Sequence, residues 1–311
     1  MNARRERCAL QDRRIVVTGA SGFLGRHLCR RLSACSADVH AVSRNARTAG
    51  PAQDLRWWQG DAADAGTVRE LVHALRPDTI VHLSGRVTAL PDLGLVLPTL
   101  HSLLVSAVNV LTAAAEIGDC RVVLAGSLTE PQEADAAPTS PYSAAKWAGS
   151  AYARMFHRLY GLPVVVVRPF MTYGPAQDPS KLIPSVATAL LEGRPPKLSS
   201  GHWQADWIFV DDVVDGIAAA LSAPAADGCT IDLGTGRLVS VRTIVQHLVH
   251  LTDARVEPLF GTLPERPLEP VRAADTGHAF ATLGWRARTP LLEGLRRTLA
   301  WYARPSASRR S

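Results

Sequence analysis

The sequence contains little cysteine, and no arrangement of it that would serve as a scaffold. Its five cysteines are odd in number and none forms a Cys-x-x-Cys pair, which argues against a disulfide framework or a zinc site and favours a reducing compartment. The chain also lacks an apolar run that approaches the length of a membrane span, and its Arg-rich start has no apolar core of a secretory signal. We therefore expect a cytoplasmic protein with no metal centre and no membrane association.

A large excess of one charge sign is also missing from the body of the chain. The 34 Lys and Arg residues exceed the 28 Asp and Glu residues by six. Seven basic residues lie near the two ends: Arg4, Arg5, Arg7, Arg13, Arg14, Arg309 and Arg310. Because the remainder is close to neutral, no nucleic-acid partner is indicated. With 47% hydrophobic residues, 311 residues suit one large globular α/β domain, or such a domain with a smaller lobe.

Short apolar segments alternate with helical periodicity along the first half of the sequence. We predict strands at 14–18, 39–43, 55–59, 79–83, 121–125 and 163–167, and helices at 23–33, 66–75, 99–118 and 142–160. Because the strands are apolar throughout, they should form a parallel sheet with helices on both faces.

The regular alternation ends after Arg168-Pro169. The next stretch is rich in Pro, Gly and Ser around one predicted helix at 181–192, and a helix at 213–222 and a strand at 229–234 are predicted to rejoin the sheet. We expect a nucleotide-binding domain at 13–174, completed by 207–235, and a smaller lobe made of 175–206 and 236–303. The segments 1–12 and 304–311 should be tails.

A glycine-rich turn follows the first predicted strand and opens the first helix. It reads Thr18-Gly19-Ala20-Ser21-Gly22-Phe23-Leu24-Gly25, a Gly-x-x-Gly-x-x-Gly spacing and not the usual Gly-x-Gly-x-x-Gly. In this context the turn and the free N–H groups of the helix start favour binding of a dinucleotide pyrophosphate. The alternative is a turn that serves packing only. Our candidate cofactor contacts here are Gly19, Ser21, Gly22, Phe23, Leu24 and Gly25.

The end of the second predicted strand bears on the choice of cofactor. It reads Ser43-Arg44-Asn45, where an NAD-binding chain would place a carboxylate for the ribose 2′-OH. Arg44 lies nineteen residues after Gly25, where a guanidinium could pair with a 2′-phosphate, so NADP(H) is preferred over NAD(H); the alternative is that Arg44 faces solvent. Asp61, after the third strand, could bind the adenine or simply hold a turn.

Tyr142 and Lys146 are four residues apart on a predicted helix and so share one face. A neighbouring ammonium would lower the pKa of the phenol toward the range useful for acid–base catalysis. On its own this spacing more often describes a solvated helix face.

Further motifs occur in a fixed order along the chain. They are Gly60-Asp61, His82-Leu83-Ser84-Gly85, Ser127, Tyr142-x-x-x-Lys146, Arg168-Pro169-Phe170-Met171-Thr172-Tyr173-Gly174-Pro175, Val210-Asp211-Asp212 and Leu233-Gly234-Thr235-Gly236. With the glycine-rich turn, their order resembles the extended short-chain dehydrogenase/reductase family (NAD-dependent epimerase/dehydratase type) over residues 13–303. The nearest members by resemblance are 4-epimerases, 4,6-dehydratases, decarboxylases and 4-ketoreductases of nucleotide-activated sugars.

The resemblance implies a Rossmann-type doubly wound sheet, a smaller discontinuous C-terminal substrate-binding lobe, and a catalytic triad. Tyr142 would exchange a proton with the sugar oxygen, Ser127 would hydrogen-bond that oxygen, and Lys146 would hold the nicotinamide ribose and lower the pKa of Tyr142. Further cofactor contacts are expected at Ala62, Leu83, Ser84, Gly85 and Pro169. A homodimer through the helices at 99–118 and 142–160 is expected on the same ground.

Departures from the family pattern narrow the reaction. Dehydratases of this family carry Asp-Glu directly after the catalytic Ser or Thr, whereas this chain has Leu128 and Thr129 there, with Glu130 one place late. The decarboxylase-type Glu is also missing, and Ser43-Arg44 argues against the tightly bound NAD of an epimerase. We expect NADPH-dependent reduction of a ketone, at C4 of a nucleotide-diphosphate deoxysugar. A sugar-nucleotide epimerase is the alternative.

The substrate-binding residues are less regular than the family pattern. Met171 replaces the family's Asn, Ala205 replaces its diphosphate-binding Arg, and the Asn-Val-x-Gly-Thr of the long helix reads Leu103-Leu104-Val105-Ser106-Ala107. The candidate substrate contacts are Arg86, Ser127, Thr129, Met171, Lys181, Trp203, Arg242 and Arg266. The alternatives are that Lys181, Arg242, Arg266 and Arg272 are surface charges, or that the substrate lacks a diphosphate.

Overall fold

The computed structural model describes residues 9–45, 55–133, 135–265 and 270–305. The chain divides into two compact units. The first contains residues up to Arg168 together with Ile217–Ile231, and the second contains Pro169–Gly216 and the residues from Asp232 onward. The chain therefore leaves the first unit at Arg168, whereas the sequence analysis placed this boundary at Gly174.

A seven-stranded sheet forms the centre of the first unit, although the last two residues of its final strand, Asp232 and Leu233, are counted with the second unit. Its strands are β1 (Arg14–Thr18), β2 (Asp38–Ser43), β3 (Arg56–Gln59), β4 (Thr79–His82), β5 (Arg121–Ala125), β6 (Val164–Pro169) and β9 (Thr230–Leu233). They lie in the order β3-β2-β1-β4-β5-β6-β9, and neighbours from β3 to β6 are parallel. The order changes direction between β1 and β4, and in such sheets ligands bind at the carboxyl ends of the strands beside this switch point.

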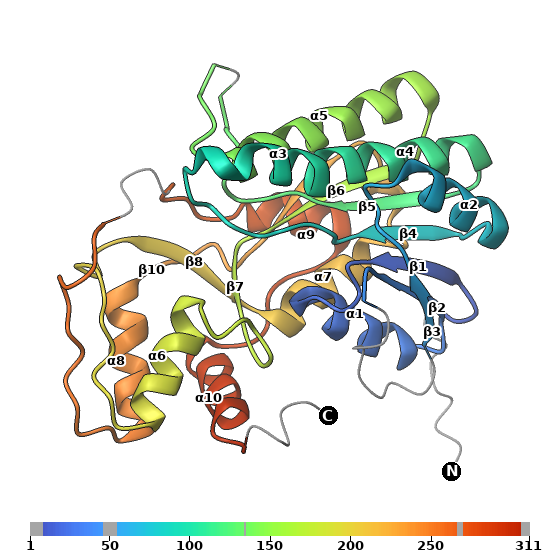
Figure 1. Cartoon of the computed structure of the whole chain (residues 1–311). Coiled ribbons are helices and arrows are strands. Elements are labelled where there is room, and N and C mark those ends of the chain that lie inside the picture. The colour runs from blue at the N-terminus through green and yellow to red at the C-terminus, as the bar shows by residue number, and fades with distance from the viewer. Residues whose placement is uncertain (1–8, 46–54, 134, 266–269, 306–311) are drawn as a thin grey trace, which may run out of the picture. The chain divides into compact units, whose positions relative to one another are not determined.

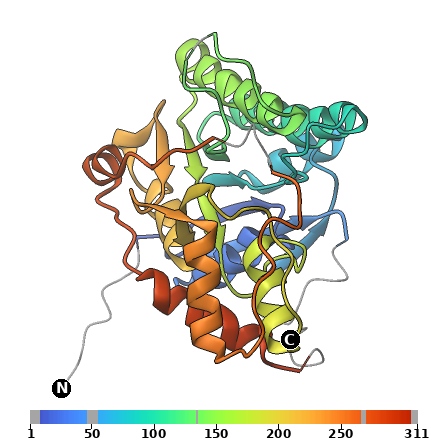
Figure 2. The same cartoon turned by 90° about the vertical axis from the view of Figure 1, so that its left-hand side faces the viewer.

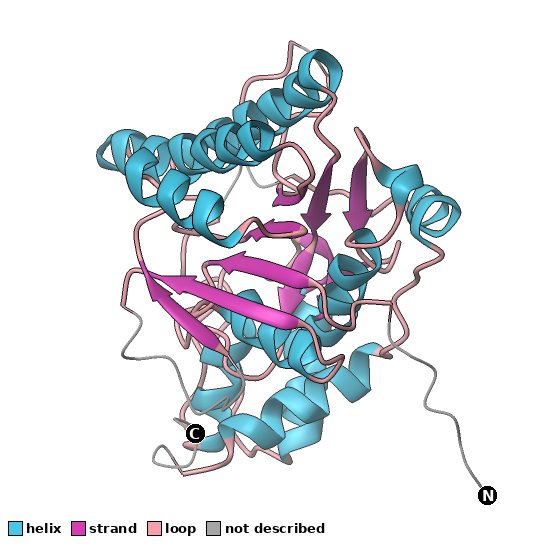
Figure 3. Cartoon of the chain, turned by 90° about the vertical axis from the view of Figure 1, so that its right-hand side faces the viewer, coloured by secondary structure: helices cyan, strands magenta, loops and turns pink. Residues whose placement is uncertain are grey.

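Helices cover both faces of this sheet (Figure 1, Figure 3). They are α1 (Phe23–Ser33), α2 (Ala65–Leu75), η2 (Leu93–Leu95), α3 (Val96–Thr99), η3 (Leu100–Val105), α4 (Ser106–Ile117), α5 (Pro141–Tyr160), η4 (Pro224–Ala226) and α7 (Val210–Ala220), which both units share. On one face, Val72 of α2, Leu111 of α4 and Phe156 of α5 join Ile80 and Val122 of the sheet in one core. The predicted doubly covered parallel sheet is confirmed.

Local signals fix the ends of the helix that carries Tyr142 and Lys146. Ser140 caps the start of α5 by accepting a hydrogen bond from the backbone N–H of Ser143, and Pro141 occupies the first turn, where its missing N–H costs nothing. Gly161 ends the helix with φ 65°, a left-handed conformation that glycine adopts readily. Residues of the local sequence therefore define both ends of the helix.

The second unit contains a three-stranded sheet in the order β10-β8-β7. Its strands are β7 (Met171–Tyr173), β8 (Gln204–Phe209) and β10 (Leu238–Ser240), with β8 antiparallel to β10 and parallel to β7. The helices are α6 (Leu182–Leu191), α8 (Val241–Thr252), α9 (Thr276–Leu283) and α10 (Leu291–Tyr302). Helices α6, α8 and α10 lie side by side (Figure 2). The sequence analysis did not predict this sheet.

Two structural features bear on the expectations drawn from what the sequence lacks. Leu93–Ile117 is, among the described residues, one helical stretch long and apolar enough to cross a membrane by length and composition, although part of it lies in the core of the first unit. Cys35 is disulfide-bonded, while Cys29, Cys120 and Cys229 are free. Within the described ranges, no group of three or more His, Cys, Asp or Glu side chains is placed to hold a metal.

Candidate active site

The glycine-rich turn between β1 and α1 approaches its neighbours so closely that side chains would collide there. Gly19 has φ +70°, and a Cβ on it would lie 2.8 Å from the backbone of Leu83 and Ser84. A Cβ on Gly25 would lie 2.2 Å from the carbonyl oxygen of Gly19. The N-cap residue of α1 is Gly22, which has no side chain that could accept hydrogen bonds from the first N–H groups of the helix. This turn fits the pyrophosphate of a dinucleotide.

Two serine hydroxyls join the glycine-rich turn to the end of β2. The hydroxyl oxygens of Ser21 and Ser43 are 2.7 Å apart, and the backbone N–H of Asn45 donates to the Ser43 hydroxyl at 3.3 Å. Arg44 and Asn45 are exposed. Arg26 donates from its guanidinium to the carbonyl oxygen of Ser21 at 2.8 Å. The sequence analysis did not single out Arg26, although a cation directly after the third glycine was a visible signal.

Asp61 and Ala62 form the turn after β3. The Asp61 carboxylate accepts a hydrogen bond from the Ala63 N–H at 3.0 Å, which is the contact of an aspartate that holds its own turn. Ala62 is buried, and its carbonyl oxygen accepts a hydrogen bond from the Asn109 side chain at 3.1 Å.

A buried histidine links β1, β4 and α4. The Ser106 hydroxyl donates a hydrogen bond to the carbonyl oxygen of Ser102 at 2.8 Å. Its oxygen therefore accepts a hydrogen bond from Nε2–H of His82 at 3.1 Å. The other ring nitrogen, Nδ1, then accepts from the Thr18 hydroxyl at 2.8 Å. Burial, followed by the charge of Lys146, lowers the pKa of His82 to about 3, so the ring is neutral at physiological pH.

The segment after β4 is shaped by a leucine from the long helix. Gly85 has φ +127°, and a Cβ on it would lie 2.1 Å from Cδ2 of Leu103. Leu103 belongs to η3, a π-helical turn, and packs with Tyr142 and Ala145 in a small apolar cluster. The leucine that replaces the family's asparagine therefore makes an apolar contact with the predicted catalytic tyrosine.

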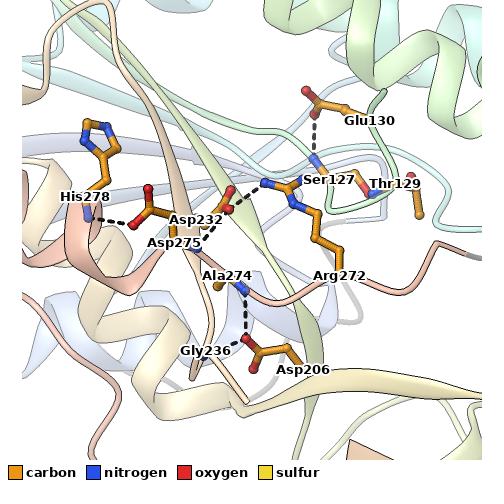
Figure 4. A network of polar contacts seen from close by, with 10 residues as sticks. All are labelled: Ser127, Thr129, Glu130, Asp206, Asp232, Gly236, Arg272, Ala274, Asp275 and His278. Carbon is orange, nitrogen blue, oxygen red and sulfur yellow. Dashed lines mark hydrogen bonds and ion pairs between the residues drawn. The ribbon is translucent and has the colours of Figure 1, made fainter. Parts of the chain in front are cut away.

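Ser127 and Tyr142 meet in the first unit, at the end of β5. Burial raises the pKa of the Tyr142 phenol to about 12, and the nearby Ser127 hydroxyl acts in the opposite direction. The expectation that Lys146 brings this pKa toward neutrality is therefore wrong in this structure, because Tyr142 is only 8% exposed. The Ser127 hydroxyl is also 2.9 Å from the hydroxyl of Thr129 (Figure 4).

Lys146 is buried one turn further along α5. Its Nζ donates to the carbonyl oxygen of Ala125 at 2.5 Å. Burial lowers its pKa to about 8, while the charge of Glu130 acts in the opposite direction. The ammonium is therefore mostly protonated at neutral pH and could hold ribose hydroxyls.

Glu130 completes the turn that carries Ser127. Its Oε1 accepts the backbone N–H of Ser127 at 2.6 Å, and its own N–H donates to the carbonyl oxygen of Ser127 at 3.2 Å (Figure 4). The contact from the Glu130 side chain matches one half of a capping box, whereas the backbone contact is that of a turn. The sequence analysis assigned Glu130 no role, although Ser-x-x-Glu was the signal that could have found it.

The remaining candidates lie elsewhere. Arg86, in the first unit, is exposed. In the second unit Met171 lies in β7 and Lys181 caps α6. The guanidinium of Arg242 donates to the carbonyl oxygen of Ser200 at 2.8 Å and stacks 3.9 Å from the centre of the Phe260 ring. Pro169 is the first residue of the second unit, Trp203 packs edge-to-face on Trp207, and Arg266 lies outside the described residues.

The second unit has a polar network around two buried aspartates that sequence reasoning missed (Figure 4). Asp206 accepts hydrogen bonds from the backbone N–H groups of Thr235, Gly236 and Ala274 at 2.7–3.0 Å. Asp232 pairs with Arg272 at 2.6 Å. These contacts hold together segments that are far apart in the sequence.

Comparison of the sequence and the structure with known proteins identifies relatives of this chain. Residues 15–234 match the model of the NAD dependent epimerase/dehydratase family. The sequence is 30% identical to UDP-glucose 4-epimerase of Mycolicibacterium smegmatis, over 94% of this chain and 99% of that protein. It is also 30% identical to dTDP-glucose 4,6-dehydratase of Streptomyces niveus, over 93% and 92% of the two chains. A solved structure of MoeE5 in complex with UDP-glucose and NAD aligns with a TM-score of 0.83 at 29% identity, covering 93% of this chain and 98% of that chain.

Proposed function

This chain belongs to the NAD-dependent epimerase/dehydratase family, and on that premise we propose that it reduces a ketone, at C4, of a nucleotide-diphosphate deoxysugar with NADPH. The proximity of the Ser127 hydroxyl to the phenol of Tyr142 carries the proposal. It places two hydroxyl groups together beside the carboxyl ends of the strands, where a sugar oxygen could accept from both. Lys146 follows one turn away on the same face of α5.

The bound nicotinamide would supply the hydride, and the residues of the chain would handle the proton. Tyr142 donates a proton to the ketone oxygen, and Ser127 hydrogen-bonds that oxygen as its negative charge develops. A pKa of about 12 keeps the phenol protonated at neutral pH, which suits a proton donor better than a base. Lys146 would orient the ribose next to the reacting ketone.

The turn after Ser127 supports reduction over dehydration. Dehydration needs an acid for the leaving hydroxyl and a base for the neighbouring proton. Leu128 is buried and Thr129 offers only a hydroxyl. Glu130 is 4% exposed and its carboxylate accepts a hydrogen bond from the Ser127 N–H. The carboxylate is therefore engaged within the turn and is not available as the acid or base of a dehydration.

The end of β2 supports the proposed preference for NADPH. Ser43 ends β2, where the family pattern has a carboxylate, and its hydroxyl lies 2.7 Å from that of Ser21. The absence of a carboxylate there removes the like-charge repulsion that a 2′-phosphate would meet. Arg44 is exposed next to Ser43, and a guanidinium can bind phosphate through two hydrogen bonds.

A second candidate is a sugar-nucleotide 4-epimerase that keeps NAD bound. The observation that favours it is the 30% identity to a UDP-glucose 4-epimerase over 99% of that protein. An epimerase passes through a ketone and returns to an alcohol, so it consumes no cofactor.

A substrate panel with measured cofactor stoichiometry separates the two reactions. Purified protein is mixed with UDP- and dTDP-linked 4-keto-6-deoxy sugars and either NADPH or NADH, and loss of reduced-cofactor absorbance is compared with product formed by NMR. Ketoreduction requires one NADPH oxidised per alcohol formed. Interconversion of UDP-glucose and UDP-galactose without added NADPH, together with inertness toward every ketone, would replace the proposal with the epimerase.

We also propose a homodimer through η3, α4 and α5, with the neighbouring α3. Large apolar side chains are exposed on these helices, including Leu97 at 64% and Leu159 at 66%, and such side chains mark protein interfaces where they form a contiguous patch. Sedimentation should give a dimer for the wild type and a shift toward monomer for Leu97→Glu. A wild-type monomer at all concentrations would refute the dimer without touching the proposed reaction.

A further inference from the structure

Glu130 is a buried carboxylate that neither the triad nor the cofactor turn accounts for. It is 4% exposed and lies three residues after Ser127. Its Oε1 accepts the Ser127 N–H at 2.6 Å (Figure 4). A buried carboxylate is costly unless it is hydrogen-bonded and paired with charge, so a residue kept there must serve the turn, the charges around it, or both.

The space for this carboxylate is made by Gly126. A Cβ on Gly126 would lie 2.5 Å from Oε1 of Glu130 and 3.0 Å from Cγ of Arg168. The backbone just after β5 therefore passes close to the carboxylate, and a side chain at this position would displace it.

Two charged groups act on Glu130, one from β6 and one from α5. Arg168 of β6 and Lys146 of α5 both favour its ionised form, although burial raises its pKa. In return, the negative charge of Glu130 raises the pKa of Lys146 and of Tyr142. His82 of β4, which also feels Lys146, stays neutral and adds no charge.

We propose that Glu130 is a positioning residue for the reaction, because its carboxylate holds the Ser127 turn through the backbone N–H and serves as the internal counter-charge of Lys146. The role rests on the proposed function, in which Ser127 and Lys146 act on the sugar oxygen and the ribose. The turn fixes where the Ser127 hydroxyl points, and the charge keeps Lys146 protonated despite its burial.

Two variants, Glu130→Gln and Glu130→Asp, test separately the charge of Glu130 and its hydrogen bond to the turn. The amide oxygen can still accept the Ser127 N–H, but the negative charge is gone. Lys146 should then lose its proton at lower pH, so the alkaline limb of kcat/KM should move down by about one pH unit, the low end of the effect of a neighbouring charge. Glu130→Asp keeps the charge on a shorter arm, so its limb should stay in place while kcat falls. Glu133→Gln, an exposed carboxylate three residues on, is the matched control and should change neither.

The pH dependence of NADPH binding, followed by cofactor fluorescence, provides a readout that needs no turnover. Because the proposed role of Lys146 is to hold the ribose, the alkaline midpoint of binding should move with Glu130→Gln by the same amount as the limb of kcat/KM. If this midpoint moves but no ketone is reduced by the wild type, the reaction is wrong and the role of Glu130 stands.

Unmoved profiles for Glu130→Gln, in both turnover and binding, would overturn the proposal and leave Glu130 as a turn residue only. If circular dichroism shows that Glu130→Gln does not fold, Glu130→Asp decides the question. An alkaline limb of kcat/KM at the wild-type pH supports the counter-charge. An alkaline limb that moves down by the full shift expected for loss of the charge overturns it.

Discussion

Lowering the pH from 7 to 5 should destabilise the first unit through His82. The ring is buried between the hydroxyls of Thr18 and Ser106, and its pKa is lowered from 6.5 to about 3 by burial and by the charge of Lys146. In the unfolded chain the ring takes up a proton below about pH 6.5, whereas in the folded chain it does not. Stability from this group is therefore present above the unfolded pKa and is lost as the pH falls toward 3.

The size of this effect follows from the difference between the two pKa values. A shift from 6.5 to about 3 corresponds to a loss of about 2 kcal/mol between pH 7 and pH 5, and about 5 kcal/mol once the pH is below 3. Other groups also titrate in this range, so measurements on the wild type alone do not isolate the contribution of His82 to the free energy of unfolding.

Comparison with His82→Gln isolates it. This variant keeps a donor and an acceptor between the two hydroxyls but cannot titrate. Urea unfolding of both proteins at pH 7, 6 and 5 should show the stability advantage of the wild type shrinking by about 2 kcal/mol. An advantage that stays constant within about 0.5 kcal/mol, or an NMR titration of the His82 ring between pH 5 and 7, would refute the buried neutral histidine.

Three further predictions concern the turn, the cofactor and the second unit. Gly25→Ala should weaken NADPH binding at least about tenfold because its Cβ would collide with Gly19, whereas Gly149→Ala, which meets only Ala107 at 3.9 Å, should stabilise α5 by about 0.5–1 kcal/mol; equal binding by both variants would contradict the close approach. Arg44→Asp should shift the NADPH/NADH ratio of kcat/KM toward NADH by about tenfold or more, with the exposed Arg255→Asp unchanged, and an unaltered ratio removes Arg44 from cofactor selection. Asp206→Ala should lower the free energy of unfolding by about 3 kcal/mol because it strands buried N–H groups, while exposed Glu257→Ala should stay within about 0.5 kcal/mol; similar melting of both would count against the Asp206 network.

The part of the fold that sequence reasoning predicted is the part with local signals. β1, α1 and β5 begin and end where their β-branched runs, glycines and helical periods indicate. The sheet of the second unit was not predicted, because β7 and β10 are three residues each and their pairing with β8 depends on segments distant in the sequence. The long helix was predicted as uniform, and the π-helical turn that brings Leu103 onto Tyr142 has no compositional mark.

The candidate site shows the same division. The spacing of Tyr142 and Lys146 and the position of Ser127 could be recognised from motifs, and the structure brings the Ser127 hydroxyl close to the Tyr142 phenol. The direction in which the pKa of Tyr142 shifts could not be predicted from the motif. It depends on burial, which is set by packing and not by the neighbour four residues away. The Ser-x-x-Glu pairing of Glu130 was legible as a turn, but its relation to Lys146 required the fold.

Tyr142→Phe tests the central claim most directly. The variant keeps the ring that packs on Leu103 but removes the proton donor. Turnover of the preferred ketone should fall by at least about 10²-fold, while the dissociation constant for NADPH stays within about twofold of the wild type. Activity that remains within about threefold of the wild type would contradict proton donation by Tyr142.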